Sequence, residues 1–244
     1  MLTLFRRIRR ELMAGHQTRT YVFYAIGEIL LVMIGILLAL QVNNWNEFRK
    51  ERIKEREILQ ELTNNINTNI TFLNEQIAFE KKWTRDYNVM IDVIANQREW
   101  HDSLQMSVRS ALWSRVPTIS FSAYESLKLT GLDVISSGAV RQSIVDLYEG
   151  HYRDLVTIMT RIVNIELKPQ VTEYVVHNMK RVVDSNRTVR FMPINSNILL
   201  TDPQYTNLLA YAQGYRQGLF DELLTKTLIK SKEVLNAIEM ELSK

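Results

Sequence analysis

The sequence predicts an all-α protein in which an N-terminal transmembrane helix continues into a long helix, followed by a helical bundle. Two observations predict this class. Residues 21–42 form an apolar run with a single charge, and the apolar residues after it recur at helical steps of three and four. No glycine or proline interrupts the chain between Val42 and Val116. The chain also lacks cysteine, which excludes disulfides, thiolate metal sites and cysteine nucleophiles.

Residues 1–20 predict a basic, cytoplasmic, amphipathic arm. The arm carries five arginines and one glutamate in a chain of formal charge +3, so the remaining residues are close to neutral. Apolar and basic residues fall on opposite helix faces, as in a helix that lies on an anionic membrane surface. The basic face holds Arg6, Arg7, Arg9 and Arg10. Because the positive charge is confined to this arm, we expect lipid headgroups as its partner and no nucleic acid.

Residues 21–43 predict one transmembrane helix. A helix of this length reaches about 33 Å, enough to cross a hydrocarbon core of about 30 Å. Interfacial side chains bracket the run. They are Tyr21 and Tyr24 at one end, and Asn43, Asn44 and Trp45 at the other. The run is too long for the apolar region of a signal peptide and lacks a cleavage motif, so we expect an uncleaved signal anchor. Basic residues flank both ends, and we favour a cytoplasmic N-terminus with the large domain outside.

Glu28 is the single charged residue inside the apolar run. If the helix enters near Tyr21, Glu28 lies about 10 Å deep, where an ionised acid costs roughly a few kcal/mol. Two structural interpretations are open: a protonated Glu28 hydrogen-bonded to Tyr24, or a shifted span that brings Glu28 to the headgroups. The functional interpretation is a pair or ring of carboxylates at an oligomer axis, binding a proton, a cation or a basic group.

Small residues lie beside Glu28 on the same helix. Gly27, Gly35 and Ala39 fall on nearly one face, and Glu28 is about 100° from Gly27. Small residues let helix backbones approach closely in lipid. We therefore expect self-association through this face.

Residues 44–244 predict one extracytoplasmic helical domain. Its first helix covers about 44–96 and is roughly 80 Å long, either continuous with the membrane helix or kinked near the asparagines. A polar stretch within it, 63–69, is a predicted weak spot, because short polar side chains compete for backbone hydrogen bonds. Further helices are expected at about 101–114, 121–129, 138–167, 169–184 and 203–244. Residues 185–201 predict an extended loop or a short hairpin.

Motifs for catalysis are absent from the sequence. The histidines lack the i, i+4 spacing of a helical metal site, and no nucleophile elbow, dinucleotide fingerprint or phosphate loop occurs. We expect a non-enzymatic protein without catalytic residues, metal or cofactor. If a ligand pocket exists, we expect it near Val116–Ile119 or Arg187–Ile198, since loops on a rigid scaffold carry sites.

Residues 24–47, YAIGEILLVMIGILLALQVNNWNE, are similar to the membrane signature of an uncharacterised family of single-pass inner-membrane proteins from Bacteroidota. Residues Ala123–Tyr148 resemble a downstream motif of that family more loosely, with Val140-Arg141 where its leucine-arginine pair stands. The resemblance implies a membrane-anchored helical domain in the bacterial inner membrane, with the domain in the periplasm. It carries no assigned activity and therefore no functional residues.

These features favour a membrane-anchored assembly or scaffold subunit that forms a homo-oligomer or joins another membrane protein. One alternative is an extracytoplasmic sensor or ligand-binding module that signals through a partner. A second alternative is an oligomeric ion or proton pathway that uses Glu28.

Overall fold

The computed structural model describes residues 18–105, 107–108, 115–183, 187 and 189–244. The described residues are essentially all-α, as the sequence predicts. The chain divides into two compact units, residues 1–55 and 56–244. Most of the predicted basic arm, with Arg6, Arg7, Arg9 and Arg10, lies outside the described residues, as do residues 109–114 of a predicted helix.

Helix α2, Thr18–Ala95, has 78 residues and is unbroken at Asn43 and Asn44. In the first unit its apolar side chains are exposed on every side; among the described residues from Val22 to Lys54, none is buried. This single long apolar helix could cross a membrane by its length and composition.

The polar stretch of α2, the predicted weak spot at 63–69, is helical. Several of its side chains donate to the carbonyl oxygen four residues earlier, as Thr63 does to Leu59 and Thr68 to Asn64. These bonds stay within the helix. Asn65 and Asn69 are buried and bond across the bundle instead. The short polar residues are therefore satisfied without breaking the helix.

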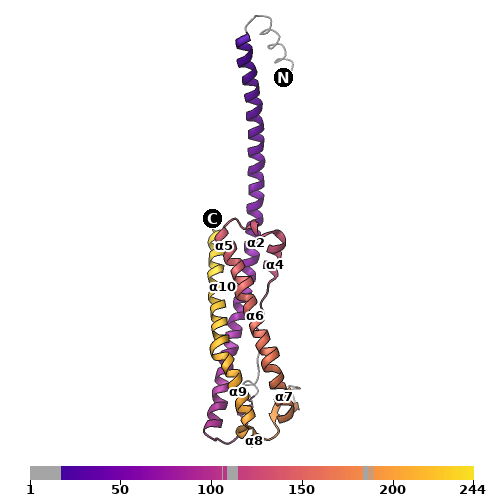
Figure 1. Cartoon of the computed structure of the whole chain (residues 1–244), viewed down its shortest axis with the longest axis vertical. Coiled ribbons are helices and arrows are strands. Elements are labelled where there is room, and N and C mark those ends of the chain that lie inside the picture. The colour runs from indigo at the N-terminus through magenta and orange to yellow at the C-terminus, as the bar shows by residue number, and fades with distance from the viewer. Residues whose placement is uncertain (1–17, 106, 109–114, 184–186, 188) are drawn as a thin grey trace. The chain divides into compact units, whose positions relative to one another are not determined.

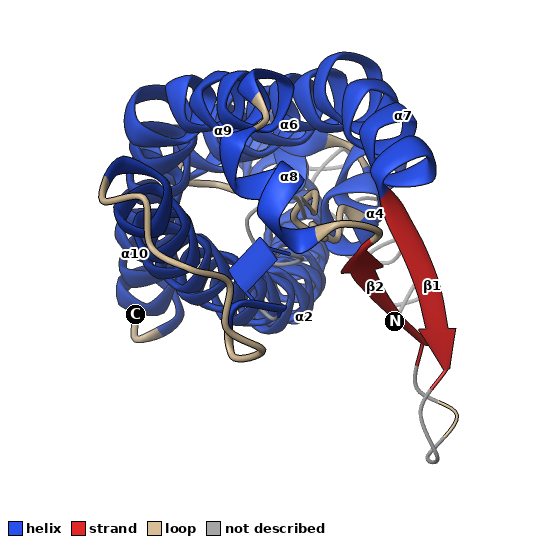
Figure 2. Cartoon of the chain, turned by 90° about the horizontal axis from the view of Figure 1, so that it is seen from below, coloured by secondary structure: helices blue, strands red, loops and turns tan. Residues whose placement is uncertain are grey.

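The second unit is a bundle in which the part of α2 that begins at Arg56 packs alongside the other helices (Figures 1 and 2). Its further helices are α4 (Ser122–Thr130), α5 (Gly138–Val145), α6 (Arg153–Thr160), α7 (Lys168–Asn178), α8 (Ser196–Thr201), α9 (Pro203–Tyr215) and α10 (Asp221–Leu242). Short helical segments connect some of them, namely the 3-10 turn η1 (Leu132–Val134) and the π-helical segments η2 (Asp146–Tyr152), η3 (Arg161–Leu167) and η4 (Arg216–Phe220).

Two apolar clusters form the core of this unit. The larger joins α2 to α4, α5, α6 and α10, with Leu62, Tyr148 and Phe220 fully buried. The smaller joins the end of α2 to α7, α8 and α9 around Met90 and Tyr205. Burying side chains of this size is the main stabilising contribution to such a bundle.

The helix predicted at 169–184 is wrong beyond Asn178. Helix α7 ends at Asn178, and strand β1 (Met179–Val183) pairs antiparallel with β2 (Val189–Pro193). β-branched residues dominate the end of β1, which favours a strand. The predicted hairpin therefore exists but begins earlier, and α8 follows it where an extended segment was expected.

Candidate functional site

The predicted membrane site lies on the first unit's part of α2. Gly27, Glu28, Gly35 and Ala39 are all exposed there. A methyl group added at Gly27 or Gly35 would meet no atom within 4 Å. The face that they share is therefore open in the single chain.

The interfacial residues of the apolar segment are placed as follows. Asn43, Asn44 and Trp45 are exposed on α2, and the side chain of Tyr21 lies outside the described residues. The Tyr24 hydroxyl is shielded from solvent but has no hydrogen-bond partner among the described residues. The hydrogen bond to Glu28 considered from the sequence is thus not formed in this structure.

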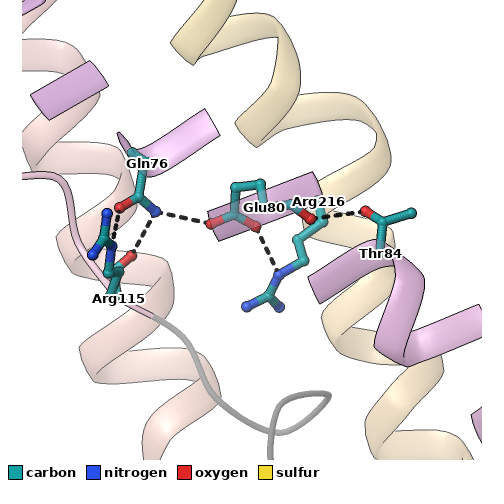
Figure 3. A network of polar contacts seen from close by, with 5 residues as sticks. All are labelled: Gln76, Glu80, Thr84, Arg115 and Arg216. Carbon is teal, nitrogen blue, oxygen red and sulfur yellow. Dashed lines mark hydrogen bonds and ion pairs between the residues drawn. The ribbon is translucent and has the colours of Figure 1, made fainter. Parts of the chain in front are cut away.

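A buried ion pair occupies the middle of the second unit (Figure 3). Glu80 extends from α2, and Arg216 is the first residue of η4; they are 8% and 5% exposed. The Nε of Arg216 donates to Oε2 of Glu80 at 3.0 Å. The guanidinium carbon also lies 4.0 Å from the centre of the Trp83 ring, close enough for a cation–π contact. Arg216 thus contacts α2 through two different interactions.

Gln76 extends this pair into a network. Its Nε2 donates to Oε1 of Glu80 at 2.9 Å and to the backbone oxygen of Arg115 at 3.2 Å, while its Oε1 accepts from Nε of Arg115 at 2.8 Å. Figure 3 shows Gln76 between Arg115 and Glu80, with Arg216 on the other side of Glu80. The network therefore ties η4 and the segment at Arg115 to one turn of α2.

Burial dominates the electrostatics of the pair. It raises the pKa of Glu80 above the ordinary value of 4.5, and the charge and hydrogen bond of Arg216 and the amide of Gln76 oppose this rise. Burial likewise lowers the pKa of Arg216, against the attraction of Glu80. Since Arg216 and Gln76 occupy one oxygen each, Glu80 is held as an acceptor. The arrangement therefore connects η4 to α2 inside the bundle.

A second polar layer lies among the aromatic side chains of the larger cluster. The Tyr148 hydroxyl donates to Oδ1 of Asn65 at 2.7 Å. The side chain of Asn69 accepts from the backbone N–H of Ser120 and donates to its oxygen, at 2.8 and 2.9 Å. These bonds fix the end of the loop that was one predicted location for a pocket. Two hydrogen bonds thus connect the end of that loop to α2.

Sequence reasoning missed the Glu80–Arg216 pair. A signal was present, because Glu80 lies in helical register with the apolar positions Ile77, Trp83 and Tyr87. A charge on an apolar face requires a buried partner. The partner could not be identified, because Arg216 is 136 positions further along the chain.

Two surface cavities involve the other predicted location, Arg187–Ile198. A cavity of about 150 Å³ is lined by Ile194, Asn195 and Ile198 together with α7 residues. A larger groove of about 890 Å³ is lined by Asn197, Trp100 and the ends of α2 and α9. Among the described residues, no three His, Asp or Glu side chains are grouped to hold a metal ion. Neither cavity therefore has such a group of side chains in its described lining.

The model of a family of unknown function, DUF6090, matches residues 28–212. No curated protein and no solved structure matches the chain.

Proposed function

Because the chain belongs to the DUF6090 family, whose function is unknown, we propose a function from the chain's own architecture. The protein is a membrane-anchored assembly or scaffold subunit that self-associates through the apolar part of α2. Its helical domain is periplasmic, and the basic arm lies on the cytoplasmic face of the inner membrane.

The observation that carries this proposal is the exposed apolar segment of α2. Large apolar side chains from Val22 to Val42 are about half exposed or more on all sides of the helix. Such a surface is unfavourable in water and favourable in lipid. The helix therefore belongs in a bilayer.

The open face at Gly27, Gly35 and Ala39 supports a second step, helix–helix association. In lipid, the hydrophobic effect no longer drives helices together, and close backbone approach takes its place. Glu28 lies within that face, about 20° from both Gly35 and Ala39, where a neighbouring helix would remove its carboxyl group from the hydrocarbon. A second copy of the chain supplies such a helix at the same depth.

Mass photometry of the detergent-extracted full chain tests the association. We expect a homo-oligomer that Gly35→Ile dissociates, because the added side chain separates the backbones. The matched control is Met33→Phe, which adds volume about 160° from Gly35 on the helix. A monomeric wild-type chain without bound partners, or equal effects of both variants, would contradict the proposal.

Glu28→Gln separates assembly from ion transport. It removes the charge and preserves the shape, so reconstituted vesicles should show unchanged proton uptake if Glu28 serves assembly. Loss of a measured proton flux in this variant would instead favour the ion-pathway alternative.

The absence of cysteine allows a direct test of orientation. Asn64→Cys places one thiol at an exposed position of the second unit. We expect a membrane-impermeant maleimide to label it in spheroplasts before lysis. Labelling only after lysis would place the domain in the cytoplasm.

A further inference from the structure

We propose that the β1–β2 hairpin is a docking element for an anionic lipid surface, a role separate from self-association through α2. The two strands pair only with each other among the described residues. An isolated two-stranded ribbon is marginally stable in water, so its free part benefits from a covering surface. Figure 2 shows the ribbon extending away from the helices of the bundle.

The base of the hairpin is anchored, and its outer part is free. Met179 and Pro193 face each other in the register and are both buried, with Met179 in the smaller apolar cluster. The N–H of Ile194 donates to the Asn178 oxygen at 2.9 Å, which closes the base. The buried base therefore attaches the outer part of the hairpin to the helical bundle.

The hairpin concentrates positive charge on a unit that is otherwise acidic. Residues 179–193 contain four basic side chains and one acidic side chain, while residues 56–244 as a whole contain 21 basic and 22 acidic ones. Lys180, Arg181 and Arg187 are exposed and form no ion pair with another described residue. This charge is thus available to an anionic partner.

Apolar side chains are interleaved with these cations. Val183 is 54% and Phe191 37% exposed, and Ile194 beside them is 61% exposed. The strand register sets Arg181 opposite Phe191 and Lys180 opposite Met192. Because residues opposite each other point to one face, each face combines a cation with an apolar side chain. An anionic lipid interface accepts both groups at once, the cation at the headgroups and the apolar side chain below them.

Vesicle capture tests this inference. The full chain is placed in neutral phosphatidylcholine nanodiscs, in a background where Arg6, Arg7, Arg9, Arg10 and Arg19 are changed to glutamine so that the arm does not contribute. Flotation then measures binding to added vesicles with or without phosphatidylglycerol. We expect capture by phosphatidylglycerol vesicles only.

The hairpin variant is Lys180→Gln with Arg181→Gln. Each cation near an anionic surface contributes about 1 kcal/mol, or about fivefold in affinity, so we expect roughly 25-fold weaker capture. The matched control is Lys81→Gln with Lys82→Gln, an adjacent exposed pair on α2. Equal losses in both variants, or equal capture by neutral vesicles, would overturn the proposal.

A second readout distinguishes lipid from a protein strand that pairs with the hairpin edge. Val183→Cys carries an environment-sensitive fluorophore, and Ile229→Cys on α10, which is 53% exposed, is the control. Phosphatidylglycerol vesicles should shift the emission of the probe at 183 to the blue and leave the probe at 229 unchanged. No shift at 183, or the same shift at both positions, would refute insertion of the hairpin into lipid.

Discussion

Arg216→Met should destabilise the second unit strongly, because it leaves Glu80 buried without its cation. Unit charges about 3 Å apart attract by about 5 kcal/mol at an effective dielectric constant of 20, and much of this offsets the cost of burial. Removing one member of a buried pair typically costs about 3–5 kcal/mol. In a unit of roughly 190 residues this lowers the melting temperature by about 6–20 °C.

The double variant Glu80→Leu with Arg216→Met should recover most of that loss. It removes both charges and replaces them with apolar groups of similar volume beside Trp83. Thermal and urea unfolding of the detergent-solubilised chain, followed by circular dichroism, measures both effects. A coupling energy of about 2 kcal/mol or more between the two positions is expected.

The pH dependence provides an independent check on the same variant. Without Arg216, the groups that oppose the rise in the pKa of Glu80 are fewer, so this pKa moves further above 4.5. A raised folded-state pKa means that the folded chain binds the proton more tightly, and stability falls as pH rises from 4.5 through the folded value. The deficit of Arg216→Met should therefore shrink on acidification. If Arg216→Met loses the same unfolding free energy at pH 5 and at pH 8, or if the coupling energy between positions 80 and 216 is near zero, the reasoning is refuted.

Three further predictions concern single positions. Burial raises the pKa of Tyr152 to about 12, while hydrogen bonds from Ser231 and Asn69 oppose this rise. Because the folded chain therefore holds the phenol proton more tightly than the unfolded chain, Tyr152 contributes about 3 kcal/mol to the free energy of unfolding below pH 10. This contribution is lost between pH 10 and pH 12. Unfolding free energies at pH 9 and 11.5 should fall more in wild type than in Tyr152→Phe, and parallel declines would contradict this. Gly131 has a φ of +104°, so Gly131→Ala should destabilise by more than about 1 kcal/mol. Gly214 lies inside α9 with open space around it, so Gly214→Ala should stabilise the protein by about 0.5–1 kcal/mol. Urea unfolding midpoints measure both glycine variants. If Gly131→Ala and Gly214→Ala shift the midpoint in the same direction, the argument from backbone conformation is wrong.

The helices could be predicted where local pattern decides them. The 3.6-residue period and the Gly131 stop define α4, and Asp202 before Pro203 begins α9, with the Asp202 side chain accepting from the Gln204 N–H at 2.8 Å. These signals are contained within a few residues. Their physical basis does not depend on the rest of the chain.

The features that could not be predicted from the sequence depend on contacts between residues far apart in the chain. Residues 179–183 were predicted as the end of a helix, but they pair with a strand ten residues later. The local pattern marks the stretch around Asn65 and Asn69 as a weak point of the helix, yet their partners Tyr148 and Ser120 lie far along the chain. The candidate membrane residues share one helix, so the sequence alone was enough to group them. The buried Glu80–Arg216 pair joins two distant parts of the chain, so only the tertiary structure reveals it.

Changes in chain length are absorbed most easily at the π-helical segments. An extra residue in a regular α-helix rotates every later side chain by about 100°, unless a π turn takes it up. Segment η2 contains the half-exposed Gly150 between the buried Tyr148 and Leu155. A chain without Gly150 can close this turn as an ordinary α-helix and keep both side chains directed at the core. Single-residue deletions at η2, η3 and η4 therefore leave the packing of the flanking helices in phase.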